Sequence, residues 1–90
     1  MVLDVGGACV GFVNALQTAS LILSTGGHRA ALLVASEVHS RVLASLGAPG
    51  EFRGLFSDGA CALVLTPARE DGETPRVGSF TFGCSGEEHF

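Results

Sequence analysis

Three apolar runs near the start of the chain predict a strand, a long helix and a second strand. Val2–Val5 ends in Gly6-Gly7, which is typical of a buried strand followed by a tight turn. From Ala8 to Ser24 apolar side chains cover most of the helical circumference, which predicts a helix buried on all sides. The run over Arg29–Ser36 is typical of a strand covered on both faces. We therefore expect a parallel, right-handed βαβ unit.

The remainder of the chain predicts further elements around this unit. They are a short helix over Val38–Leu46, a loop through Gly47, Pro49 and Gly50, a buried strand over Ala60–Thr66, an exposed hairpin connection over Pro67–Pro75 and a strand over Val77–Gly83. The expected fold class is α/β, in one segment over residues 1–90, with no internal repeat and no interdomain linker.

The composition is more apolar than a free-standing domain of this size requires. Hydrophobic residues make up 47% of the 90 residues and charged residues 16%. A chain this short buries roughly two-thirds of its unfolded surface, so the excess predicts a missing partner surface. The same balance excludes intrinsic disorder. The net charge of −4 argues against nucleic acid or an anionic membrane as the main partner.

The location of the protein follows from what the sequence does not contain. Asp4 precedes the first basic residue, Arg29, which is the reverse of a secretory signal. The low-charge stretch over Val5–Gly27 holds too many polar residues for a bilayer span. Three cysteines, with no CxxC, do not form a disulfide framework. We expect a soluble, cytoplasmic protein.

Cys9 stands where the first predicted strand turns into the long helix. A helix N-terminus presents free amides and the positive end of the macrodipole, which favours a thiolate. The turn aims its residues into the crevice beyond the strand, where α/β sheets place ligands. The Cys9 backbone N–H also points where an acyl oxyanion would develop. Cys9 is thus a candidate nucleophile, and the alternative is a small buried apolar residue.

A competing interpretation treats the same turn as a nucleotide-binding loop. Gly6-x-Ala8-x-x-Gly11 is one residue away from the dinucleotide-binding pattern, and Glu37 follows the next strand. The pattern needs glycine at the middle position so that backbone can approach the pyrophosphate, and Ala8 stands there. The alternatives to an enzyme are therefore a Rossmann-like binding module and a non-catalytic interaction remnant.

Four blocks in order resemble the β-ketoacyl-acyl-carrier-protein synthase III family of the thiolase superfamily. The first, around Ala8-Cys9-x-Gly11-Phe12, is similar to the family's nucleophile motif. The others are Leu33-Val34-Ala35-Ser36-Glu37 with Ser40, Leu55-Phe56-Ser57-Asp58-Gly59-Ala60, and Phe82-Gly83-Cys84-Ser85-Gly86. The resemblance covers essentially the whole chain. It departs at Ser57 and Cys61, where the family most often has glycine, which leaves the subfamily open.

The resemblance implies a thiolase-like layered fold and an acyltransferase. Cys9 would accept an acyl group from acyl-CoA, and malonyl-carrier protein would then condense with it in fatty acid or polyketide biosynthesis. The family's catalytic His and Asn come much further after the nucleophile than this chain extends. The segment would thus lie in the N-terminal half of a longer homodimeric enzyme, with the C-terminal catalytic half missing, and be inactive in condensation alone. No cofactor beyond the substrates is implied.

Other residues carry weaker expectations. Phe12 packs near the acyl chain or in the core, and Ser57, Asp58 and Gly59 form a turn that shapes the site, although an Asx turn before a strand also explains Asp58. Glu37 is a ribose or metal ligand, or a structural hydrogen-bonding group near a subunit interface. Cys61 is inert packing inside a strand. The histidines at 28, 39 and 89 are unclustered, which argues against zinc, and His89 comes too early to be the family's base.

Overall fold

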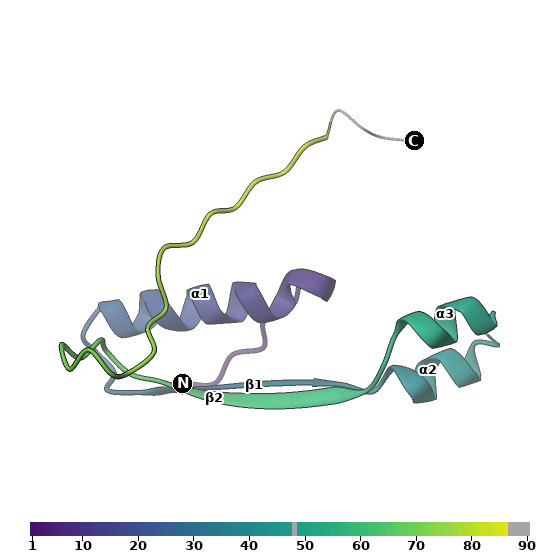
Figure 1. Ribbon diagram of the computed structural model, residues 1–90, viewed down its shortest axis with the longest axis horizontal. Helices are drawn as coiled ribbons and strands as arrows, with labels where there is room; N and C mark the ends of the chain where they lie inside the picture. The colour runs from purple at the N-terminus through teal and green to yellow at the C-terminus, as the bar shows by residue number, and fades with distance from the viewer. Residues whose placement is uncertain (48, 87–90) are drawn as a thin grey trace.

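The computed structural model describes residues 1–47 and 49–86. It consists of one long helix on a two-stranded ribbon, with two short helices at the end of the ribbon (Figure 1). In chain order the elements are a 3₁₀ turn η1 (Ala8–Val10), α1 (Gly11–Ser24), β1 (Ala31–Glu37), α2 (His39–Ser45), α3 (Gly50–Leu55) and β2 (Gly59–Leu65). The α/β class is therefore confirmed.

Helix α1 confirms the long helix expected over Ala8–Ser24, except that its first turn is tightened into η1. Polar residues inside it are satisfied locally: the hydroxyl of Thr18 donates to the Asn14 carbonyl at 2.8 Å, and that of Ser20 to the Leu16 carbonyl at 2.9 Å. The helix stops where Gly26 takes a positive φ of 75° and its N–H bonds to the Leu23 carbonyl. This is the glycine stop that the sequence predicts.

Strands β1 and β2 confirm the runs expected over Arg29–Ser36 and Ala60–Thr66, and they pair antiparallel. The register runs from Ala31 opposite Leu65 to Glu37 opposite Gly59. Among the described residues this is the only strand pairing. The expected parallel βαβ unit is therefore wrong as a hydrogen-bonded unit in this structure.

The reason is the position of the first segment. A cavity of about 750 Å³ lies between residues 1–6, α1 and β1, and it separates Val2–Val5 from the strand. Strand pairing requires backbones about 4.8 Å apart, so a segment across a cavity cannot form a ladder. Val2–Val5 is consequently extended chain rather than the expected strand.

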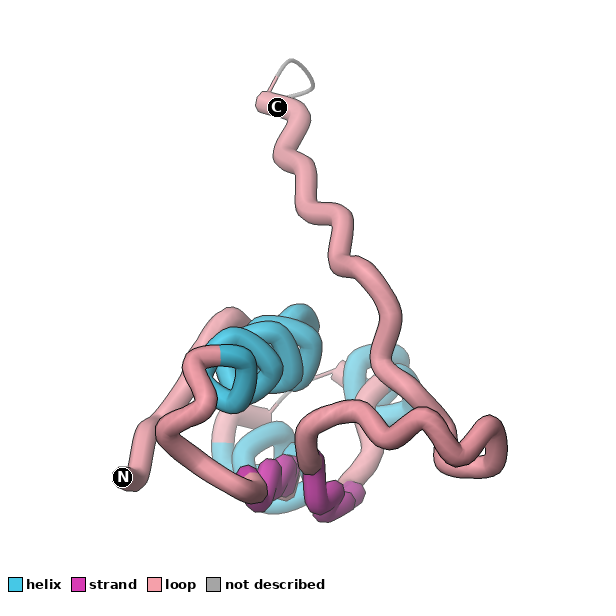
Figure 2. The backbone as a smooth tube through the Cα atoms, turned by 90° about the vertical axis from the view of Figure 1, so that its left-hand side faces the viewer, coloured by secondary structure: helices cyan, strands magenta, loops and turns pink. Residues whose placement is uncertain are grey.

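The strand expected over Val77–Gly83 is also not formed. This segment leaves the ribbon and runs away from it (Figures 1 and 2), so no neighbouring strand pairs with it. Its alternating pattern brings only Phe80 and Phe82 together, with ring centroids 6.2 Å apart. The connection over Pro67–Pro75 is exposed, as expected, but it joins no second strand and is not a hairpin.

The short helix predicted over Val38–Leu46 is confirmed by α2, whereas α3 lies where a loop was expected. The carbonyl of Pro49 accepts bonds from the amides of Phe52 and Arg53, and Glu51 and Arg53 complement the helix dipole. The placement of an acid in the first turn and a base in the last turn favours a helix here, which the glycine-based prediction of a loop did not take into account.

Burial is confined to the contact between α1 and the ribbon. Leu23 and Leu33 are 6% exposed, while Leu32 is 69% exposed and Val64 is 70% exposed. Figure 2 shows α1 on one side of the strands and nothing from the described chain on the other. Within the described residues the helix and both strands therefore lack the cover on all sides that their apolar patterns predict, and a partner surface that would supply it stays a prediction.

The overall dimensions agree with this open arrangement. The radius of gyration is 17.1 Å, whereas a compact domain of this length would have roughly 12 Å. The apolar excess seen in the composition is thus not buried within the chain. None of the helices in residues 1–47 and 49–86 has the length and hydropathy that a bilayer crossing requires.

Candidate functional site

The turn that carries Cys9 has an unusual backbone. Gly7 has a φ of 142°, and Ala8, which is not a glycine, has a φ of 48°. The first helical bond then runs from the Val10 N–H to the Gly7 carbonyl at 3.1 Å. The amides of Ala8 and Cys9 therefore precede the first bond of the helix, as the leading amides of a helix do.

Asn14 connects this turn to the helix. Its side-chain amide donates to the Gly6 carbonyl at 3.3 Å, eight residues earlier. A Cβ atom added at Gly7 would lie 2.5 Å from the Asn14 Nδ2 atom and would displace that side chain, and the backbone conformation of Gly7 itself favours glycine. Asn14 was not among the predicted site residues, because nothing local in the sequence links it to Gly6.

Cys9 is exposed on the surface of this turn. The alternative of a small buried packing residue therefore does not apply in this structure. Phe12, one turn further along α1, is 36% exposed and so is not enclosed in a core either. Both predicted residues lie at the beginning of the long helix, open to solvent.

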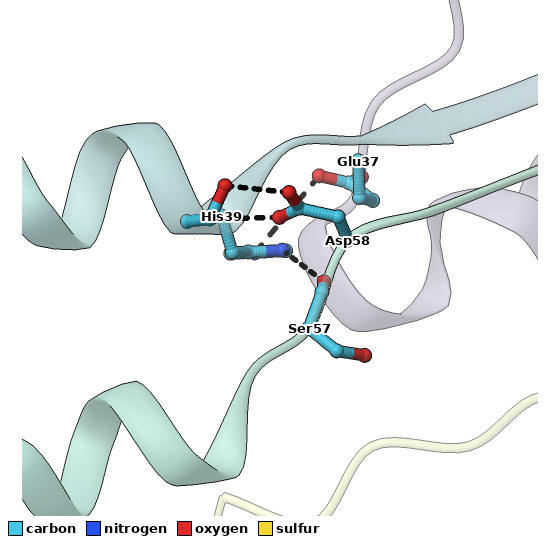
Figure 3. A network of polar contacts seen from close by, with 5 residues as sticks. Glu37, His39, Ser57 and Asp58 are labelled. Atoms are coloured by element: carbon cyan, nitrogen blue, oxygen red, sulfur yellow. Dashed lines mark hydrogen bonds and ion pairs between the residues drawn. The ribbon is translucent and has the colours of Figure 1, made fainter.

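The second group of predicted residues lies where the chain leaves β1 and returns to β2; we call residues 37–40 and 56–59 the junction (Figure 3). The carboxylate of Asp58 accepts two hydrogen bonds from Ser40, one from its backbone N–H at 2.8 Å and one from its hydroxyl at 2.5 Å. An Asx turn was the alternative for Asp58, but both oxygens bond 18 residues away instead.

His39 forms the rest of the junction. Its Nδ1 donates to the Ser57 carbonyl at 3.3 Å, and its Nε2 lies 3.9 Å from a Glu37 carboxylate oxygen (Figure 3). The His39 ring stacks on Phe56 with centroids 5.2 Å apart and planes inclined by 21°. The predicted role of Glu37, as a ligand or as a hydrogen-bonding group near a subunit interface, stays a prediction, since this 3.9 Å separation is longer than a hydrogen bond. His39, Ser40 and Phe56 make contacts in this group, and none of them was among the predicted site residues.

The electrostatics of the junction are dominated by Ser40. The hydrogen bonds from its hydroxyl and backbone N–H stabilise the Asp58 carboxylate and hold the pKa of Asp58 below its ordinary value of 3.8. Asp58 is therefore ionised at neutral pH, with both oxygens engaged as acceptors.

The structure brings together three of the five predicted site residues. Ser57, Asp58 and Gly59 line a hollow of about 470 Å³ at the junction, and Cys9 and Phe12 do not line it. Cys9 lies in η1, directly before α1, and α1 begins toward the same end of the ribbon (Figure 1). Among the residues that the structure describes, no hydrogen bond or ring contact joins the two groups.

The remaining candidates are dispersed. Cys61 is exposed rather than packed inside a buried strand, because both faces of β2 are open. Cys84 is also exposed. Among the residues that the structure describes, no group of three metal-ligating side chains occurs. His89 lies outside the described residues.

Comparison with known proteins places these features in a family. The profile of 3-Oxoacyl-[acyl-carrier-protein (ACP)] synthase III matches residues 3–86, which include both the Cys9 turn and the junction. The chain belongs to the 3-oxoacyl-[acyl-carrier-protein] synthase III family. This membership confirms the resemblance that the four sequence blocks carry.

Two curated relatives of this synthase III family member are similar over most of its length. A beta-ketoacyl-[acyl-carrier-protein] synthase III of Erythrobacter litoralis (strain HTCC2594) is 38% identical over 96% of the chain. One of Clostridium acetobutylicum is 40% identical over 77% of it. The chain spans only 26% and 21% of the lengths of these relatives. No solved structure matches it.

Proposed function

We propose that residues 1–90 carry the acyl-accepting cysteine of an acyltransferase of the 3-oxoacyl-[acyl-carrier-protein] synthase III type. The supporting observation is that Cys9 is exposed at the first turn of a long helix, inside the segment that matches the family. Leading helix amides and the positive end of the helix dipole favour negative charge at that position.

The proposed reaction begins with acyl transfer. The Cys9 thiolate attacks the carbonyl carbon of an acyl-CoA, a bond from Sγ to that carbon forms, and the bond from the carbon to the sulfur of CoA breaks. CoA leaves as a thiolate and takes up a proton from solvent. The developing oxyanion would meet the Cys9 backbone N–H, in the manner of other acyl-transfer sites. The product is an acyl-thioester on Cys9.

The second proposed step uses parts of the fold that these residues do not include. Malonyl-carrier protein would lose CO₂, and its carbanion would displace Cys9 from the acyl carbon, forming a carbon–carbon bond. We assign this step to a complete, cytoplasmic and homodimeric protein of thiolase-like fold, acting in fatty acid or polyketide biosynthesis. We expect the 90 residues alone to be inactive in condensation.

Intact mass measurement after incubation with a short acyl-CoA tests the acyl transfer. The whole protein that carries residues 1–90 should gain the mass of one acyl group, and peptide mapping should place that group on Cys9. Cys9→Ser should remove the gain. Cys61→Ser is the matched control, because Cys61 is also an exposed thiol but lies in β2, and it should leave the gain unchanged.

The outcomes separate clearly. Acylation that persists in Cys9→Ser, or a folded whole protein that gains no acyl group, contradicts the proposal. Absence of condensation by the 90 residues alone does not bear on it, because the proposal places that step elsewhere.

A further inference from the structure

Helix α2 lacks a capping residue of its own. Its N-cap is Val38, whose side chain has no oxygen, and no side chain at the N-cap accepts a bond from the first turn. Ser40 is the second residue of α2, and its N–H is one of the amides that a cap normally satisfies. Asp58 accepts this N–H at 2.8 Å, so the cap of α2 comes from a residue 18 positions later.

The same contact closes the excursion formed by α2 and α3. The chain leaves the ribbon after Glu37 and returns at Gly59, and these two residues form the last pair of the ladder. Asp58 and Ser40 lie beyond that pair, and His39 extends the contact by its hydrogen bond to the Ser57 carbonyl and by stacking its ring on Phe56. The turn before β2 is therefore held by the start of α2.

This arrangement gives Asp58 a structural role in the turn. Both carboxylate oxygens accept hydrogen bonds from Ser40, at 2.8 and 2.5 Å. An ionised carboxylate can only accept hydrogen bonds. Its donors in the turn are the N–H and the hydroxyl of Ser40, and these two bonds fix its position. The carboxylate therefore holds the turn in place by accepting hydrogen bonds from Ser40.

We infer that Asp58 is a positioning residue: by capping α2 through Ser40 it fixes the Ser57–Gly59 turn at the end of the ribbon toward which α1 begins (Figure 1). Cys9 lies in η1, the turn that directly precedes α1. The inference rests on the proposed function, because the role it assigns to the turn is to shape the surroundings of the acylated cysteine. Asp58 acts through the turn and does not touch the reacting atoms.

The test combines amide exchange with the kinetics of acylation in the whole protein. Asp58→Ala removes both bonds, Ser40→Ala removes the hydroxyl bond, and Asp58→Asn keeps an oxygen for the Ser40 N–H. Asp71→Ala is the matched control, since the Asp71 carboxylate also accepts from a backbone N–H and a hydroxyl of one residue, Thr74, but joins no separate elements.

Asp58→Ala should accelerate hydrogen exchange of the Ser40 amide by roughly fivefold, the size expected for loss of one hydrogen bond. It should also lower the saturating rate of Cys9 acylation with little change in the half-saturating acyl-CoA concentration. Asp58→Asn should recover most of that rate. The pH profile of acylation should keep its shape, because a positioning residue exchanges no proton with the substrate.

Each contrary result identifies what has failed. Unchanged exchange at Ser40 in Asp58→Ala overturns the cap. If Asp58→Ala speeds exchange of the Ser40 amide but is acylated at the same rate as Asp71→Ala, the positioning role is overturned and the proposed function stands. A shifted pH profile of acylation in Asp58→Ala overturns the positioning role in favour of proton transfer by Asp58. If the wild-type protein is not acylated at Cys9, the proposed function fails, and exchange at Ser40 still decides the cap.

Discussion

Two parts of this chain are held together by different forces. The contact between α1 and the ribbon depends on apolar burial, with Leu23 and Leu33 each 6% exposed. The junction depends on polar contacts: the Asp58 carboxylate on Ser40, and His39 on the Ser57 carbonyl. Apolar burial is insensitive to ionisation, whereas a carboxylate contact depends on pH.

The difference indicates how the segment is organised. The apolar contact orders the long helix that begins with Cys9, and it does so on one face of the ribbon only. The polar junction orders a turn that is open to solvent, where apolar burial is not available. The segment formed by α2 and α3 can thus be held at the end of the two strands without a hydrophobic core, because hydrogen bonds join its first and last residues.

The largest expected effect comes from removing the apolar contact under α1. Leu33→Ala should lower the free energy of unfolding by about 2 to 5 kcal/mol, because it leaves a cavity between α1 and β1. Leu32→Ala, its neighbour on the open face at 69% exposure, should change it by less than about 0.5 kcal/mol. Urea unfolding of the whole protein, followed by circular dichroism, measures both.

The same pair of variants tests whether the two faces of β1 differ in burial in the whole protein. Equal losses in Leu33→Ala and Leu32→Ala would mean that the face opposite α1 is covered in the whole protein. The described chain would then show only half of the burial that β1 experiences.

The elements with a clear hydrophobic period were predictable. The all-round apolar pattern located α1, the continuous runs located β1 and β2, and Gly26 marked the helix end. Strand direction was not predictable, because a run such as Leu32–Val34 has the same composition in parallel and antiparallel pairs. Val2–Val5 and Val77–Gly83 have strand patterns, but a pattern forms a strand only beside a partner backbone.

The candidate site was predictable to a similar degree. Cys9 could be identified because its surroundings are local: a glycine turn followed by a helix. The contact between Asp58 and Ser40 could not, because 18 residues and two helices separate them. One signal was present, however: Val38 has no side-chain oxygen to cap α2, which leaves the first-turn amides open to an acceptor from elsewhere in the chain or to water.

A smaller effect is expected at the turn before Cys9. Gly7→Ala should lower the free energy of unfolding by about 1 to 3 kcal/mol, because alanine is strained at a φ of 142°. Its Cβ would also displace the Asn14 side chain from the Gly6 carbonyl. The midpoint temperature of thermal unfolding and the rate of Cys9 acylation should both be lower than in the wild type.

Two controls separate these causes. Gly72 also has a positive φ, 71°, but a Cβ there meets nothing within 4 Å, so Gly72→Ala reports backbone strain alone and should leave acylation unchanged. Asn14→Ala combined with Gly7→Ala removes the clash. Acylation of Gly7→Ala at the wild-type rate would show that the turn geometry is unimportant to Cys9.

The smallest effect is the pH dependence of the junction. Because the pKa of folded Asp58 is below its ordinary value of 3.8, its contribution to stability is fully present above that value and is lost as the pH falls through the lower, folded value. In Ser40→Ala the pKa of Asp58 should move back toward 3.8, since the hydroxyl bond is the largest cause of its lowering. Carboxyl NMR titration measures this, with Asp71 as the internal reference: its pKa is lowered by Thr74 and should not change. Identical titration of Asp58 in wild type and Ser40→Ala would show that the junction is not held by this bond, and the contrast with the apolar contact under α1 would disappear.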